Sequence, residues 1–326
     1  MRSDTRGVHR REFLGLLGAG VCRAALASEK HDTKPLRGIF PIAQTPFTDS
    51  DRIDLDALAR EVKFLDQTGA HGFAWPQMAS EYATLSESER LAGAEAIVAA
   101  GKHLRPATVI GVQSADLPSA LKYARHARKI GADGIISLPP IEKNSASVLE
   151  YYREIGKATD LPLFVQSTGD MSVELIVRMC RAIPTLSYVK DEAGRSPLAR
   201  IGQLKDQSGD RLKVFTGNHG STLIDEMQRG SSGSMPAAAF ADLYVPVWEL
   251  WQKGRHNEAM DLFGKVLLFI PEVQAYGIQS LKYLLYLRGV FPAYGVRAKD
   301  TAVPLDESGK RVLGEMLQFV KPWLKA

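Results

Sequence analysis

Short apolar runs alternate along the chain with longer segments in which apolar residues recur every three or four positions. The runs have the length and the β-branched and aromatic content of buried strands, and the longer segments have the period of amphipathic helices. The predicted strands cover residues 38–43, 72–75, 107–112, 134–138, 163–166, 186–190, 213–216 and 233–235. Eight such strand–helix units between residues 36 and 254 predict an α/β fold, a (β/α)8 TIM barrel.

The chain after residue 254 has a different pattern, with helical periodicity and no strand signal. It predicts a C-terminal helical extension over residues 255–326, with helices at 257–270, 274–287 and 308–324. A doubly wound open sheet is the alternative to the barrel, but no glycine-rich G-x-G-x-x-G turn follows the first predicted strand. Some helix starts are well marked, because Ser86 and Glu89 have the spacing of a capping box and Ser172 precedes an apolar helical face.

Residues 1–27 have the pattern of a signal peptide for export. The adjacent residues Arg10 and Arg11 are followed by a short apolar run and by Ala25-Leu26-Ala27, which has the A-x-A pattern of a cleavage site. The paired arginines resemble a twin-arginine signal, so we expect a periplasmic protein. The apolar run is far shorter than the roughly 20 residues that span a bilayer, which predicts no stable membrane anchor. The alternative is a basic amphipathic helix that stays part of the protein.

The net charge of +4 comes largely from this N-terminal segment, which holds five arginines and two acidic residues. The rest of the chain is nearly neutral and has no basic face, so we expect no nucleic-acid partner. No group of His, Cys, Asp and Glu has metal-ligand spacing, and we expect neither a metal nor a cofactor. Hydrophobic residues make up 45% of the chain and charged residues 24%, which excludes disordered, collagen-like and coiled-coil classes.

Candidate chemistry lies at the carboxyl ends of the predicted strands, where barrel enzymes carry their working residues. Strict alternation places Leu186, Tyr188 and Lys190 on one face of the sixth strand, which we expect to line the barrel interior. A lysine there is desolvated, which favours the neutral amine that attacks a ketone to form an imine. The alternative is a surface lysine paired with Asp191 or Glu192. We expect Tyr188 to belong to an aromatic core layer.

Three stretches of the chain resemble one enzyme family. They are Gly38-Ile39-Phe40-Pro41-Ile42-Ala43-Gln44-Thr45-Pro46-Phe47, Ser80-Glu81-Tyr82-Ala83-Thr84-Leu85-Ser86 and Val189-Lys190-Asp191-Glu192. They are similar to the opening strand, the turn after strand two and the lysine-bearing strand of the dihydrodipicolinate synthase/N-acetylneuraminate lyase family of class I Schiff-base lyases. The resemblance extends over most of residues 36–290. It implies a homo-oligomer, a tetramer or dimer, in which Lys190 forms an imine with a small-molecule 2-oxo acid.

The chain departs from this family at three places. At one of them Pro139-Pro140-Ile141 stands where the family has Pro-Tyr-Tyr after strand four. Where the family has Gly-Thr-Thr-Gly-Glu, with threonines that hold the substrate carboxylate, this chain has Gln77-Met78-Ala79-Ser80-Glu81, so only one hydroxyl is left. Where the family has a catalytic tyrosine at the end of strand five, this chain has Val165-Gln166-Ser167. A glutamine orients a group but does not shuttle a proton near pH 7. The synthase reaction, which needs that tyrosine, is therefore disfavoured.

The same departures resemble one branch of the family, the dehydratases of the 2-keto-3-deoxyarabonate type. That branch shares Ser-Glu, Val-Gln, Lys-x-Glu and Met-Pro, the last matched here by Met235-Pro236. The resemblance implies a lyase, a dehydratase or an aldolase, that acts on a 2-keto-3-deoxy sugar acid. Lys190 then forms the imine, and Glu192 is the candidate acid/base, with a carboxyl pKa that we expect a water-poor mouth to raise.

The candidate substrate-binding residues follow from these motifs and from the loops after strands seven and eight. They are Ser80, Glu81, Gln166, Ser167, Asn218, Ser234 and Met235. Glu81 has a structural role as its alternative. A non-catalytic exported barrel that binds 2-oxo or sugar acids is the alternative function, since the tyrosine is replaced by Gln166. The retained Lys190 favours the enzyme, because burying a lysine costs free energy that a pure binding protein does not need to spend.

Overall fold

The structure is a computed structural model that describes residues 34–140, 144–194, 197–298 and 303–326. The predicted export signal at 1–27 lies outside the described residues. Among the helices in the described parts of the chain, none is long and apolar enough to cross a membrane.

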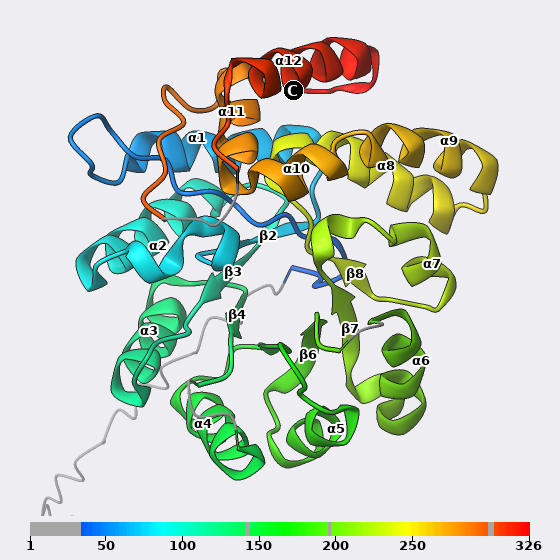
Figure 1. The fold of residues 1–326 in the computed structure, drawn as a ribbon. Coiled ribbons are helices and arrows are strands. Elements are labelled where there is room, and N and C mark those ends of the chain that lie inside the picture. Colours follow the sequence, from blue (N-terminus) through cyan, green and yellow to red (C-terminus); the bar gives the residue numbers. More distant parts are fainter. Residues whose placement is uncertain (1–33, 141–143, 195–196, 299–302) are drawn as a thin grey trace, which may run out of the picture. The chain divides into compact units, whose positions relative to one another are not determined.

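Eight parallel strands form a barrel, and each is paired with its neighbours in chain order (Figure 1). The strands are β1 Gly38–Ile39, β2 Gly72–Trp75, β3 Ala107–Gly111, β4 Gly134–Ser137, β5 Leu163–Gln166, β6 Leu186–Asp191, β7 Lys213–Thr216 and β8 Gly233–Ser234. β8 pairs with β1, and the His71 N–H donates to the Ile39 carbonyl (3.0 Å), which joins β1 to the start of β2. These contacts confirm the predicted TIM barrel.

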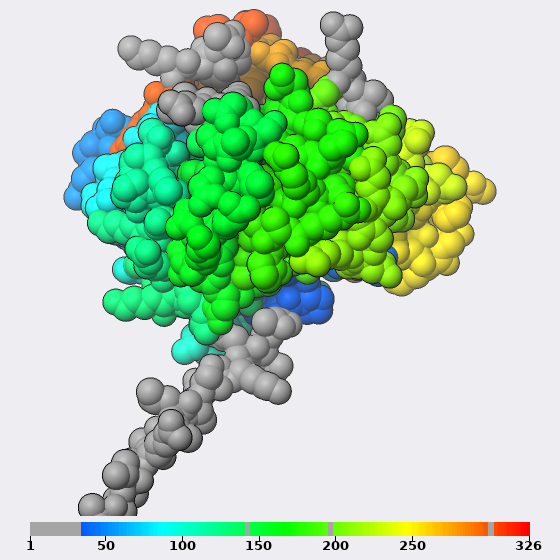
Figure 2. Space-filling model, turned by 90° about the horizontal axis from the view of Figure 1, so that it is seen from below, coloured from blue at the N-terminus to red at the C-terminus, as the bar shows by residue number. Residues whose placement is uncertain are grey.

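Helices follow the strands and pack on the outside of the barrel (Figure 1). They are α1 Leu55–Thr68, α2 Glu87–Gly101, α3 Leu117–Ile130, α4 Ser145–Ala158, α5 Val173–Ala182, α6 Pro197–Ser208, α7 Leu223–Gln228 and α8 Ala241–Gln252. Segments from the middle of the chain, drawn in green, cover one face of the barrel (Figure 2). The predicted caps are confirmed, because Ser86 and Glu89 form a reciprocal capping box and Ser172 accepts the Leu175 N–H.

An aromatic cluster fills the barrel interior. The rings of Phe164 and Tyr188 stack with centroids 4.4 Å apart, and Phe215 meets Phe164 edge to face at 5.3 Å. Phe40 packs on the other side of Phe215 at 5.2 Å. The prediction that Tyr188 belongs to an aromatic core layer is therefore confirmed. Because these rings occupy the interior, polar chemistry is confined to the mouth of the barrel.

The strict alternation predicted for the sixth strand is wrong at one residue. Leu163 pairs with Leu186, but the next pair is Phe164 with Tyr188, so Ser187 is an extra residue on β6. A one-residue bulge changes the face on which every side chain before it lies. Leu186 accordingly packs in the outer core between strands and helices, whereas Tyr188 packs in the interior.

The C-terminal extension consists of α9 His256–Leu267, α10 Ile270–Tyr276, α11 Ile278–Leu287 and α12 Glu307–Val320. The single helix predicted at 274–287 is wrong, because Gly277 has φ 57° and separates α10 from α11. The first strand is also shorter than the predicted 38–43, with only an isolated bridge at Ile42 beyond Pro41, which lacks an N–H. Figure 1 shows α11 and α12 on the same side of the barrel as α1.

Candidate active site

A cavity of about 250 Å³ lies at the carboxyl ends of the strands. Its lining comes from residues that end or follow five strands, namely Gln77, Gln166, Lys190, Glu192, His219 and Met235. A wider hollow of about 720 Å³ shares Met78 with this cavity and reaches Glu81 and Ala298. The cavity is the point where the barrel's polar groups converge above its aromatic interior.

Lys190 and Glu192 form an ion pair inside this cavity. The Lys190 Nζ atom lies 3.0 Å from Glu192 Oε2, and the lysine is only 5% exposed. The predicted alternative was a surface lysine paired with Asp191 or Glu192. The pair with Glu192 exists, but the lysine is buried and Glu192 is half-buried. An amine held in this way is fixed in position by the strand and by its counter-charge together.

The Glu192 carboxylate accepts two further hydrogen bonds. Gln166 Nε2 donates to Oε2 (2.6 Å), and the Asn218 backbone N–H donates to Oε1 (3.1 Å). Burial raises the pKa of Glu192, but the Lys190 charge and these donors outweigh it and hold that pKa below its ordinary value. The predicted raised pKa is therefore wrong, and the carboxyl group is ionised in this state.

Gly217 permits this close approach of β6 and the loop after β7. A Cβ atom at position 217 would lie 1.8 Å from Glu192 Oε1, so a side chain there would displace the carboxylate. The absence of a side chain at Gly217 lets the Asn218 N–H reach the carboxylate. The Asn218 side chain itself donates to Ser221 Oγ (3.1 Å), so this residue, predicted to bind substrate, lines the cavity but holds Glu192 through its backbone.

Ser167, predicted to bind substrate, instead holds the end of β6. Its hydroxyl donates to Asp191 Oδ1 (2.5 Å) and accepts the N–H groups of Glu192 (3.0 Å) and Ala193 (3.1 Å). Arg200 completes the unit with two hydrogen bonds to the Asp191 carboxylate (2.8 and 2.9 Å). Ser167 is fully buried and does not line the cavity, so its contacts position Glu192.

Two other predicted substrate-binding serines also point away from the cavity. The Ser80 hydroxyl donates to the Ala43 carbonyl (2.5 Å) and accepts the Gln77 N–H (3.0 Å), which braces the turn after β2. Ser234 Oγ lies 3.1 Å from Thr216 Oγ1, on the outer side of neighbouring strands. Both serines are fully buried, and their hydroxyls are already engaged.

Met235 and Gln166 lie where the sequence placed them, in the cavity lining. Sequence reasoning missed Gln77, which lines the same cavity. It placed the Gly217-Asn218-His219 segment at the mouth, either to bind substrate hydroxyls or as a solvated turn, and His219 lines the cavity. The Gly-Asn-His motif after the seventh strand was a signal for His219, but the position of the ring depends on a turn that only the structure shows. In the described parts of the chain, no group of three or more His, Cys, Asp and Glu residues is arranged to hold a metal ion.

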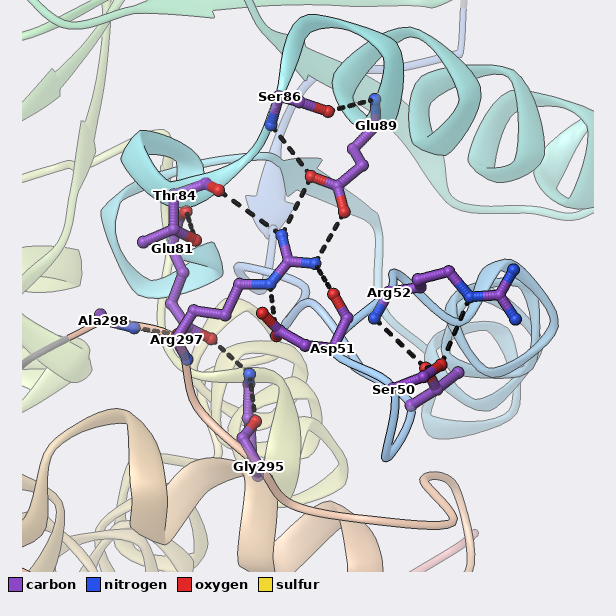
Figure 3. Close-up of polar contacts among 12 residues, drawn as sticks. Ser50, Asp51, Arg52, Glu81, Thr84, Ser86, Glu89, Gly295, Arg297 and Ala298 are labelled. Carbon is purple, nitrogen blue, oxygen red and sulfur yellow. Dashed lines mark hydrogen bonds and ion pairs between the residues drawn. The ribbon is translucent and has the colours of Figure 1, made fainter.

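Glu81 joins the barrel mouth to the C-terminal extension, as the structural alternative predicts. Its carboxylate forms a fully buried ion pair with Lys282 of α11. Its other oxygen accepts the backbone N–H groups of Arg297 (2.6 Å) and Ala298 (2.7 Å), shown in Figure 3. Glu81 thereby holds the segment around Ala298 beside the wider hollow.

The Arg297 side chain strengthens the same connection (Figure 3). Its guanidinium donates to both oxygens of Glu89 at the start of α2 (2.7 and 2.9 Å) and to Asp51 Oδ1 (2.8 Å). It also lies over the Phe47 ring, 4.1 Å from the centroid. Sequence reasoning missed Arg297 and Lys282, because both lie in the extension, far from any strand end.

Comparison with known proteins agrees with this geometry. The model of the dihydrodipicolinate synthetase family matches residues 35–319. The chain belongs to that family. It is therefore an enzyme of the lyase class.

Two curated relatives within the dihydrodipicolinate synthetase family illustrate its range. L-2-keto-3-deoxyarabonate dehydratase from Azospirillum brasilense is 27% identical over 267 residues, which cover 78% of this chain and 85% of that protein. 4-Hydroxy-tetrahydrodipicolinate synthase from Methanosarcina mazei is 30% identical over 210 residues, which cover 62% of this chain and 70% of that protein. The crystal structure of dihydrodipicolinate synthase from Rhodopseudomonas palustris is 25% identical, with a TM-score of 0.79 over 86% of this chain and 97% of that one.

The Arg297 contacts predict an acid-sensitive contribution to stability. The hydrogen bond from Arg297 is the main cause that lowers the pKa of Glu89 from 4.5 to about 2. A carboxyl group whose pKa is lower in the folded than in the unfolded protein stabilises the folded state at pH values above its unfolded pKa. That contribution is lost as the pH falls through the folded pKa. Arg297→Gln should therefore lower the free energy of unfolding at pH 7 and flatten its loss between about pH 5 and 2.

Urea denaturation at several pH values measures this difference. Arg52→Gln is the matched control, since the exposed Arg52 side chain donates, among the described residues, to Ser50 Oγ alone (3.4 Å). An Arg297→Gln variant that loses stability with the same pH slope as the parent protein would contradict the role assigned to the Arg297–Glu89 pair.

Proposed function

We propose that the protein is a dehydratase that removes water from a 2-keto-3-deoxy sugar acid through an imine on Lys190. The observation that carries the proposal is the buried Lys190 amine, 3.0 Å from the Glu192 carboxylate in a cavity of substrate size. Similarity to the dehydratase of Azospirillum brasilense supports this substrate class. The cavity combines a buried amine with polar groups that can orient a hydroxylated chain.

The proposed reaction proceeds through an imine on Lys190 and an enamine. The Lys190 ammonium gives up a proton, its amine adds to the C2 ketone, and the ketone oxygen leaves as water once that proton is returned to it, which gives a cationic imine. The imine withdraws electrons from C3, so Glu192 removes a C3 proton and an enamine forms. The enamine expels the C4 hydroxyl, which takes that proton and leaves as water. Hydrolysis of the imine then restores Lys190 and releases the unsaturated 2-oxo acid.

Two glutamines support a hydroxylated substrate over an apolar one. The amide nitrogen of Gln77 is engaged by the Pro76 carbonyl (2.9 Å), and that of Gln166 by Glu192. Their amide oxygens are buried and have no hydrogen-bond partner among the described residues. Buried polar atoms in folded proteins are normally paired, so we propose that substrate hydroxyl groups donate to these oxygens.

Reductive trapping tests the imine. Borohydride reduction in the presence of pyruvate, or of a panel of 2-keto-3-deoxy acids, should attach the acid covalently to Lys190, as peptide mass mapping reports. Lys190→Met should abolish the adduct, whereas Lys253→Met, at an exposed lysine of the same charge, should leave it unchanged. Absence of an adduct with every 2-oxo acid would rule out the lyase proposal, and an adduct without turnover would favour a binding protein.

The role of Glu192 is tested separately from imine formation. Glu192→Gln keeps a hydrogen-bonding group beside Lys190 but removes the base, so the adduct should still form while turnover slows by about 10²-fold or more. Steady-state turnover of 2-keto-3-deoxy acids measures the effect. Glu258→Gln, at an exposed carboxylate on α9, is the control for the loss of one negative charge. Unchanged turnover in Glu192→Gln would remove this residue from the mechanism.

We also propose that residues 1–27 direct export through a twin-arginine signal to the periplasm. The proposal is supported by Arg10 and Arg11 and by the A-x-A pattern at 25–27. Replacing both arginines by lysine should keep the protein in the cytoplasm, and N-terminal sequencing of the exported form should begin at Ser28. An unprocessed N-terminus in the periplasm would contradict cleavage. Assembly as a homodimer or homotetramer stays a prediction of the family resemblance.

A further inference from the structure

His219 lies in the cavity of Lys190 and Glu192 and has no role in the reaction described above. Its ring is part of the cavity lining, on the short helix η4 (Asn218–Gly220) that follows β7. Among the described residues, no group forms a hydrogen bond or ion pair with either ring nitrogen. The site therefore holds an imidazole whose donor and acceptor positions are both free for a reacting molecule.

The backbone at this turn is held in a conformation that side chains other than glycine rarely adopt. Asn218 has φ 48° and His219 has φ 54°, both in the left-handed region. The Tyr244 hydroxyl donates to the His219 carbonyl, which fixes the turn from the side of α8. Such strain is retained only where the surrounding structure enforces it, and it is concentrated at functional sites. The fold thus enforces the placement of this ring.

The electrostatic surroundings of His219 keep its ring neutral. Burial is the main cause that lowers the pKa of His219, and the Lys190 charge lowers it further, whereas Glu192 raises it. The other titratable groups nearby are Tyr244 of α8 and, coupled to it, Glu226 of α7, and burial raises the pKa of both. Lys190 and His219 line the same cavity, and a neutral imidazole there is a base that can accept a proton from the Lys190 ammonium.

Imine formation needs such a base. A lysine ammonium has no lone pair, so it must lose a proton before its amine attacks a ketone. The proton must then return, because the carbinolamine hydroxyl leaves as water only when it is protonated. The Lys190 charge is one of the causes that lower the pKa of His219, so the loss of that charge makes the imidazole a stronger base.

We propose that His219 is the proton carrier of imine formation at Lys190. This inference rests on the proposed imine and assigns the residue that makes it form quickly. The Lys190 ammonium passes one proton to the neutral imidazole, and the free amine adds to the C2 carbonyl to give a neutral carbinolamine. The imidazolium returns the proton to the carbinolamine hydroxyl, the C2–O bond breaks and water leaves. The cationic imine and the neutral imidazole remain, so charge and atoms balance.

The variant His219→Asn tests this role with little change in the backbone. Asparagine adopts the left-handed region more readily than most residues, and it has no titratable ring. The rate of adduct formation on Lys190 is measured with pyruvate and excess cyanoborohydride across a range of pH. We expect about a 10²-fold slower rate near neutral pH, loss of the pH dependence due to the imidazole, and partial recovery with added imidazole. His103→Asn, at an exposed histidine after α2, is the matched control.

The outcomes separate this inference from the proposed function. If the parent protein forms no adduct, the imine and the role of His219 both fail. If the parent forms it and His219→Asn forms it at the same rate and pH profile, only the role of His219 is overturned. A slower rate with an unchanged pH profile and no recovery with imidazole, together with a lowered melting temperature, assigns a structural role and also overturns the proposal.

Discussion

The structure depends on keeping one amine charge-compensated inside a barrel whose interior is filled by aromatic rings. Removing the Lys190 ammonium from water costs several kcal/mol unless an opposite charge lies close by, and Glu192 supplies that charge at 3.0 Å. The neighbouring residues hold the Glu192 carboxylate in place. Gln166 donates to it, and Gly217 leaves room for the backbone N–H that follows. The candidate site is therefore a consequence of a single buried pair and of the groups that hold it.

Other residues at the mouth of the barrel hold the Lys190–Glu192 pair in position. Ser167 ties the end of β5 to the first residues beyond β6, so Glu192 cannot move away from Lys190 without breaking several hydrogen bonds. On the opposite side, Glu81 and Arg297 connect the turn after β2 to the C-terminal extension. The extension is thus part of the mouth and carries the groups that close one side of it.

The barrel, and the lysine at the end of its sixth strand, were predictable because both depend on local pattern. Buried strands are short and apolar, amphipathic helices repeat at a fixed period, and an isolated lysine at a strand end is visible in the chain itself. Glu192 was found for the same reason, since it lies two residues from Lys190. Most strand ends shifted by no more than a residue, but the first strand ends four residues early, at Ile39. α10 and α11 were merged, because Gly277 breaks the helix through a conformation that periodicity does not report.

The amino-acid sequence by itself determined the order of the elements, the place of Tyr188 in the aromatic interior and the position of the candidate lysine at the end of the sixth strand. Tertiary structure alone decided which polar groups face the cavity. The bulge at Ser187 moved Leu186 to the outer core, and the hydroxyl of Ser167 was taken up by backbone groups distant in sequence. The tertiary structure also lowers the pKa of Glu192 and places His219 in the cavity lining. These features depend on distances between separate strands and loops, which a linear pattern does not contain.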